Sequence, residues 1–125
     1  MAESVEPHSP LPPGALPGFV EKASPAVDVS NIAGNLWSAL EPLGTIHLRL
    51  FDKPLVITSG RDSIHAPSSK HGQGKALDLR VNDKSPEEAA CLLFILRIIA
   101  RRFKLAVFDE SNLPGQAHIH LESVE

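Results

Sequence analysis

The first regular pattern along the chain is an apolar stripe with helical spacing. Its members follow one another at intervals of three or four residues: Ile32, Leu36, Leu40 and Leu43. This period predicts an amphipathic helix with one buried face. Ser30 is a suitable residue to cap the start of the helix, whereas Pro42 and Gly44 mark its expected end.

A second pattern, of alternating apolar and polar residues, begins directly after that helix. Over residues 45–51 the apolar positions are Ile46, Leu48 and Leu50, and the polar ones are His47 and Arg49. Such alternation predicts a half-buried strand on which His47 faces solvent. Asp52 and Lys53 are suited to a turn into an apolar strand over 54–58, so the two strands are expected to form a β-hairpin.

The middle of the chain predicts a loop followed by a strand. Residues 59–74 are rich in Ser, Gly, Pro and His, which is a loop composition. Residues 75–81 alternate again, and this alternation places Asp78 on the face opposite Leu77 and Leu79. The Asp78 side chain is therefore expected to point away from the apolar side of the strand.

A long helix follows this strand. Residues 85–88 read Ser-Pro-Glu-Glu, a capping box with proline at the first helical position, and the helix is expected to run to about Phe103 with burial on more than one side. Its most apolar run, 89–96, is interrupted by Arg97 and is much shorter than the roughly 20 residues of a membrane span. Cys91 lies within that run and is expected to pack there as a small hydrophobic residue.

Two further strands are predicted at the end of the chain. They cover 105–109 and 117–122, and the Asn-Leu-Pro-Gly sequence at 112–115 predicts a turn between them. Because side chains alternate between the two faces of a strand, His118 and His120 are expected on one face.

Together these elements predict an α+β fold, namely a small, mostly antiparallel β-sheet with flanking helices, covered by the helix at 85–103. The chain of 125 residues is long enough for one domain. Residues 1–26 are Pro-rich and lack periodicity, so we expect an extended, flexible leader there and the folded domain over 27–125. The first residues lack the pattern of a secretory signal or a transit peptide, so no export route is expected, and the localisation stays open.

Composition narrows the partners only slightly. Hydrophobic residues make up 42% of the chain, and its net charge of −3 favours neither nucleic acid nor a membrane surface as a partner. The single cysteine excludes a disulfide framework and a cysteine-type zinc site. The oligomeric state is not indicated by the sequence.

Two imidazoles and a carboxylate stand in a pattern suited to a single metal ion. The candidates are His71, Asp78 and one of the two histidines at 118 and 120. Zinc binds neutral imidazole nitrogen and carboxylate oxygen, and a catalytic zinc site has three protein ligands and one open position. If the strands that carry Asp78 and the last histidines pair closely, the three side chains meet on one face.

These residues resemble a motif of the zinc D-Ala-D-Ala carboxypeptidases and L-alanyl-D-glutamate endopeptidases, a family that shares its fold with hedgehog signalling domains. The matching positions are Ser69, His71, Gly74, Ala76 and Asp78, in the spacing S-x-H-x-x-G-x-A-x-D. The closing Ala117-His118-Ile119-His120 segment is similar to the final H-x-H strand, and to its hedgehog form in particular. The resemblance covers about residues 54–122.

The resemblance implies specific roles for several residues. It implies that His71, Asp78 and His120 bind zinc and that His118 lies nearby, where it either supports a ligand or faces the substrate. His65 matches a histidine of the hedgehog branch, and Thr58-Ser59-Gly60-Arg61 resembles a T-S-G-x-R segment, with the arginine one residue early. The implied substrate-binding residues are Arg61, His65 and Ser69, with Arg61 suited to hold a peptide carboxylate.

The chain departs from the family at the general base. Many of these peptidases have an acidic residue three positions before the last ligand, where this chain has Ala117. The hedgehog branch has a glutamate in a Glu-Ser segment shortly before the last strand, and Glu110-Ser111 resembles it with an insertion. Glu110 is therefore the expected base, and Asp109 is the alternative.

The resemblance implies a zinc peptidase that hydrolyses an amide bond in peptidoglycan stem peptides, as a carboxypeptidase or an endopeptidase. The expected catalytic residues are Glu110, as base, and His118; either His118 or His65 would stabilise the developing oxyanion. The alternative is a zinc-stabilised module that binds a peptide or protein with little or no turnover, as the departure at Ala117 suggests.

Overall fold

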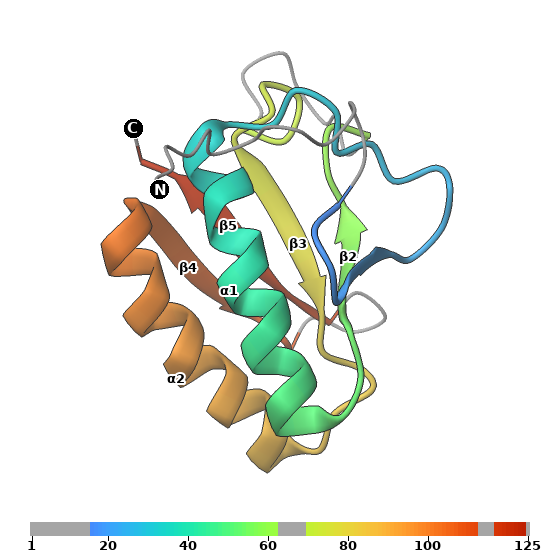
Figure 1. Ribbon diagram of the computed structural model, residues 1–125, viewed down its shortest axis with the longest axis vertical. Coiled ribbons are helices and arrows are strands. Elements are labelled where there is room, and N and C mark those ends of the chain that lie inside the picture. The colour runs from blue at the N-terminus through green and yellow to red at the C-terminus, as the bar shows by residue number, and fades with distance from the viewer. Residues whose placement is uncertain (1–15, 63–69, 113–116, 125) are drawn as a thin grey trace, which may run out of the picture.

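The computed structural model describes residues 16–62, 70–112 and 117–124. Within them the chain folds into one five-stranded sheet and two helices, an α+β arrangement (Figure 1). The strand order across the sheet is β1-β2-β3-β5-β4. The strands are β1 (Val20–Lys22), β2 (Leu55–Ser59), β3 (Ala76–Arg80), β4 (Leu105–Glu110) and β5 (His118–Ser123), and the helices are α1 (Gly34–Phe51) and α2 (Pro86–Phe103).

The sheet is mixed, whereas the sequence predicted a mostly antiparallel one. β1 pairs with β2 in parallel, and the other three pairings are antiparallel. β1 lies inside the range 1–26, which was expected to hold no packed structure, and its Val20 is part of the core. Three residues of strand are too few for a periodic signal, so only the pairing with β2 reveals this element. Residues 1–15 lie outside the described residues.

The predicted hairpin over 45–58 is wrong, because helix α1 continues to Phe51. The helix runs through Pro42 and Gly44, which were expected to end it, and only β2 remains of the two expected strands. His47 follows the buried Leu43 by four residues, so both lie on the same side of the helix. The buried stripe of the helix therefore continues into residues 45–51, where apolar and polar residues also alternate. Proline at position 42 removes one helical hydrogen bond, yet the packed face on both sides maintains the helix.

His47 is buried, although the alternating pattern placed it at the surface. Its side chain is 1% exposed and its Nδ1 donates a hydrogen bond of 2.7 Å to the Lys53 carbonyl, just beyond the end of α1. Nε2 is buried without a hydrogen-bond partner among the described residues. Burial, opposed by the bond to Lys53, lowers the pKa of His47.

This buried imidazole predicts a loss of stability in mild acid. Because the folded chain holds His47 neutral, the unfolded chain binds more protons as the pH falls below about 6.5. The free energy of unfolding should decrease over that range, with a slope of at most about 1.4 kcal/mol per pH unit from this group. Urea unfolding at several pH values should show that the His47→Asn variant lacks this component, since Asn retains a donor near Lys53 but does not titrate. Parallel pH profiles for the two proteins would contradict the prediction.

Helix α2 confirms its prediction at both ends. Ser85 and Glu88 form both halves of the capping box, and Lys104 ends the helix in the left-handed conformation with φ 58°. Its outer face is more open than expected, since Cys91 is exposed and Phe94 and Ile98 are 66% and 51% exposed. The expectation of a packed Cys91 is therefore wrong, because α2 buries one side rather than several. Neither helix of the described chain is long and apolar enough to cross a bilayer.

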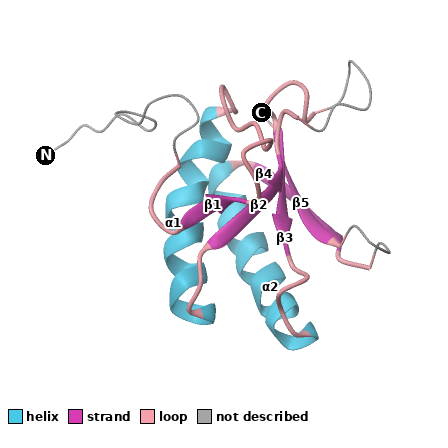
Figure 2. Cartoon of the chain, turned by 90° about the vertical axis from the view of Figure 1, so that its right-hand side faces the viewer, coloured by secondary structure: helices cyan, strands magenta, loops and turns pink. Residues whose placement is uncertain are grey.

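Both helices pack on the same face of the sheet (Figures 1 and 2). Alternation sends Leu77 and Leu79 of β3, and Ile119 and Leu121 of β5, into the core. No helix of the described residues covers the other face of these strands (Figure 2). The same alternation places polar side chains there, among them Asp78 and both histidines of β5. This second face, which we call the open face, is where the candidate site lies.

Candidate metal centre

Neighbouring central strands supply two of the expected ligands. Asp78 of β3 and His120 of β5 are directly paired in the antiparallel register, so their side chains project side by side from the open face. The buried residues that flank Asp78 and His120 in their strands hold this register. A shift by one residue would turn Leu77 and Leu79 of β3, or Ile119 and Leu121 of β5, into solvent. The hydrophobic pattern therefore determines which face receives the carboxylate and the imidazole.

The third expected ligand, His71, reaches the open face from a tight turn before β3. The turn is closed by hydrogen bonds from the Lys75 amide to the Lys70 carbonyl, 2.8 Å, and from the Gly74 amide to the His71 carbonyl, 3.0 Å. Gly74 has a φ of +75°, and a Cβ at this position would lie 2.7 Å from the Asn31 carbonyl oxygen. Glycine is therefore required here both for the backbone conformation and for the close approach.

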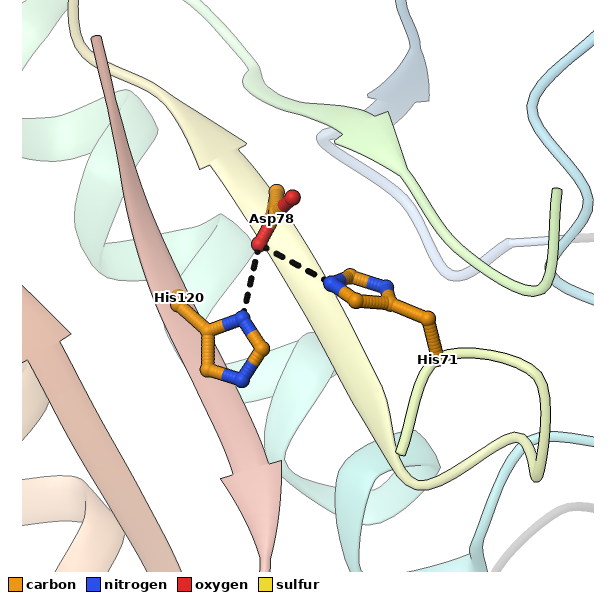
Figure 3. Close-up of side chains that lie close together, drawn as sticks. All are labelled: His71, Asp78 and His120. Carbon is orange, nitrogen blue, oxygen red and sulfur yellow. Dashed lines mark hydrogen bonds and ion pairs between the residues drawn. The ribbon is translucent and has the colours of Figure 1, made fainter. Parts of the chain in front are cut away.

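The three side chains meet at one point (Figure 3). His71 Nε2 lies 3.3 Å, and His120 Nδ1 3.0 Å, from Asp78 Oδ1. The three ligand atoms all lie within 4.8 Å of one another. Four ligands about 2.0–2.1 Å from a zinc ion stand about 3.3–3.4 Å apart in a tetrahedron, and the two separations from Asp78 Oδ1 are close to this value.

The outer nitrogen of His71 is fixed by the backbone. His71 Nδ1 donates a hydrogen bond of 3.1 Å to the carbonyl of Gly60, which leaves Nε2 facing Asp78. Gly60 is held against Asp28, whose carbonyl oxygen would be 2.2 Å from a Cβ on Gly60. A hydrogen bond to the outer nitrogen is the usual way in which proteins orient a metal-binding histidine.

The hydrogen-bond pattern calls for positive charge at this point. A carbonyl and a carboxylate only accept hydrogen bonds, and each imidazole has such an acceptor at both nitrogens: His71 has Gly60 and Asp78, and His120 has Asp78 and Glu122. A neutral imidazole carries one N–H. One metal ion bound to Nε2 of His71 and Nδ1 of His120 would satisfy both rings, since each would keep its single N–H for Gly60 or Glu122.

The pKa shifts of Asp78 and His120 arise from the same contacts. Burial would raise the pKa of Asp78, but the hydrogen bonds from His120 and His71 hold it well below its usual range. Burial would lower the pKa of His120, but the hydrogen bonds to Asp78 and Glu122 raise it. The carboxylate is thus ionised and available as a ligand. Two nitrogens and one oxygen suit zinc and also other first-row ions.

A second acid and imidazole pair lies beside this group. Glu110, at the end of β4, is paired with His118 of β5, and Glu110 Oε1 lies 2.6 Å from His118 Nε2. The same nitrogen is 3.6 Å from Asp78 Oδ1, so the pair adjoins the candidate metal ligands. His118 is 16% exposed, whereas the Glu110 side chain is 40% exposed and open to water.

The two alternatives to Glu110 lie elsewhere. Asp109 is paired with the buried Ile119, and its carboxylate accepts hydrogen bonds from the amide and hydroxyl of Ser111. Ala117 packs against the hydrophobic core. Of the three positions considered for a base, the structure brings only Glu110 to His118.

The expected substrate-binding residues are only partly described. Arg61 lies alongside the turn that carries His71, with Nη1 3.3 Å from the point where a Cβ on Gly74 would stand. His65 and Ser69 lie outside the described residues, as do 113–116 of the predicted turn. The roles of Arg61, His65 and Ser69 stay predictions from the resemblance.

The sequence analysis missed two residues that contact the ligand group, Glu122 and Gly60. Glu122 accepts a hydrogen bond of 3.0 Å from His120 Nε2. Its position two residues after His120 was a usable signal, because alternation places residues 118, 120 and 122 of one strand on the same face. The Gly60 carbonyl left no such signal, since its contact with His71 depends on how two loops meet.

Comparison of the chain with models of known protein families and with curated proteins finds no match.

Proposed function

We propose that this chain is a zinc-dependent peptidase that hydrolyses an amide bond in peptidoglycan stem peptides, as a D-Ala-D-Ala carboxypeptidase or a related endopeptidase with a hedgehog-like fold. The observation that carries the proposal is the convergence of His71, Asp78 and His120 beside the Glu110–His118 pair. The motif resemblance at residues 69–78 and 117–120 supplies the reaction class and the substrate class.

Three atoms would hold the metal: Nε2 of His71, Oδ1 of Asp78 and Nδ1 of His120. When bound, zinc polarises a scissile carbonyl and lowers the pKa of a water molecule to near 7. The carboxylate of Asp78 would offset part of the ion's charge. In each imidazole the other ring nitrogen is already hydrogen-bonded, in His71 to the Gly60 carbonyl and in His120 to Glu122.

Glu110 is the proposed general base. Its carboxylate is exposed enough to contact water and is oriented by the 2.6 Å hydrogen bond from His118. Glu110 takes a proton from the attacking water and returns it to the leaving amine nitrogen. Once Glu110 is protonated, the His118 Nε2–H is free to donate to the developing oxyanion.

Arg61 is the proposed contact for a substrate carboxylate. Its guanidinium lies close to Gly74, in the turn that positions His71. A guanidinium makes two parallel hydrogen bonds to a carboxylate, a group that both the end of a stem peptide and a D-glutamate residue offer.

A metal-stabilised module that binds peptides without turnover is the second candidate. This candidate is favoured by Ala117, which stands where many family members have an acidic residue and packs against the hydrophobic core. The two candidates share the metal centre and differ in whether the Glu110 carboxylate acts on water.

Digestion of purified stem peptides tests the proposal. The protein loaded with zinc should release D-alanine or cut the stem internally, a chelator should stop the reaction, and added zinc should restore it, as followed by liquid chromatography and mass spectrometry. A metal-loaded protein that leaves every stem peptide intact would refute the peptidase and support the binding module.

A further inference from the structure

The second nitrogen of His120 has an anionic partner that the proposed chemistry does not use. His120 Nε2 donates a hydrogen bond of 3.0 Å to Glu122 Oε1, while Nδ1 of the same ring faces Asp78. Glu122 is 24% exposed and therefore partly shielded from water. Its contact lies on the side of the ring away from the other two ligands.

The neighbours of Glu122 leave room for this contact. Across the sheet its register partners are Ala76 on β3 and Ala106 on β4, so both flanking strands present only a methyl group there. Residues two apart on one strand face project about 6–7 Å apart, a span that a glutamate side chain lying along the strand can bridge. The two alanines therefore allow Glu122 to turn toward His120.

The two histidine ligands are consequently supported in different ways. His71 donates its outer N–H to the neutral carbonyl of Gly60, whereas His120 donates its outer N–H to a carboxylate. A carboxylate partner favours the tautomer with the proton on Nε2 and makes Nδ1 a stronger electron donor to a metal. It also adds negative charge close to the cation.

We infer that Glu122 is a positioning residue that holds His120 with Nδ1 available to the metal and raises the affinity of the centre for zinc. This inference rests on the metal centre of the proposed function but not on hydrolysis. Glu122 touches neither substrate nor metal and acts only through His120.

Metal affinity and the His120 ring proton provide the test. The dissociation constants for Zn²⁺ and Co²⁺ are measured by competition with a coloured chelator for the wild type, Glu122→Gln, Glu122→Ala and the control Glu21→Gln, which changes an exposed glutamate on β1. Glu122→Ala should weaken binding by about 10–100-fold, Glu122→Gln by less because its amide oxygen still accepts the hydrogen bond, and the control by less than twofold.

A spectroscopic measurement separates positioning from loss of fold. In the zinc-loaded wild type, NMR should detect the His120 Hε2 proton, protected from exchange by Glu122, and Glu122→Ala should lose this signal while the rest of the spectrum is retained. Affinities for Glu122→Ala within twofold of wild type, or an unchanged Hε2 signal, would overturn the inference. Because no substrate is used, a failed digestion experiment leaves this result unaffected.

Discussion

The Asp78→Asn variant should lose zinc. We expect its affinity for zinc to fall by more than about 100-fold, which exceeds the 10–100-fold typical of residues that only support a ligand. The reason is that Asp78 supplies the single anionic ligand atom, Oδ1, and stands between His71 Nε2 and His120 Nδ1 at 3.3 and 3.0 Å. An amide of the same shape offers a neutral oxygen and a competing N–H donor.

Chelator competition and thermal unfolding both measure this loss. For the wild type, zinc at a hundred times its dissociation constant should stabilise the fold by about 2.7 kcal/mol, whereas the variant should gain almost nothing at the same concentration. Asp52→Asn is the matched control, because Asp52 ends α1 with a φ of 58°, a conformation that asparagine tolerates, and it is exposed. Equal zinc affinity in Asp78→Asn and the control would show that the convergence of the three side chains does not bind metal.

The Glu110→Gln variant should keep its metal and lose its activity. We expect kcat/KM for stem-peptide hydrolysis to fall by about 10²–10⁴, because glutamine cannot accept the proton of the attacking water. The shape of the side chain and its hydrogen bond with His118 are largely preserved, so the variant should fold and bind zinc as the wild type does.

Asp109→Asn distinguishes the two candidate bases. The residue is adjacent to Glu110 in the sequence, but its carboxylate is bound to Ser111 and it is paired with the buried Ile119. Its substitution should leave kcat/KM within about twofold of wild type. If Asp109→Asn abolishes hydrolysis and Glu110→Gln does not, the assignment of the base is wrong.

The strongest patterns predicted helix α2 and the two strands that carry Asp78 and His120. The capping box at Ser85 marked the start of α2, and the alternation around Asp78 and His120 predicted β3 and β5 with these side chains on the face away from the core. These predictions succeeded because a capping box and a period of two are local properties, and a buried face leaves one register available.

The predictions failed where the same residues satisfied two periods. Residues 45–51 alternate in polarity, as a strand does, and also continue the helical stripe of α1. The local pattern therefore does not distinguish a strand from a helix here. The choice depends on packing, since His47 becomes an interior residue only when its helix lies against the sheet. In the same way, the short β1 gains its structure from pairing with β2.

By itself, the sequence determined the α+β class, the extents of α2, β3 and β5 to within one residue at each end, and the three residue types suited to a metal ion. Only the tertiary structure decided that His71, Asp78 and His120 meet, that Glu110 rather than Asp109 stands beside His118, and that Glu122 supports His120. The reason is physical: spacing along the chain selects the face on which a side chain lies, whereas the meeting of separate strands and loops depends on how the whole core packs.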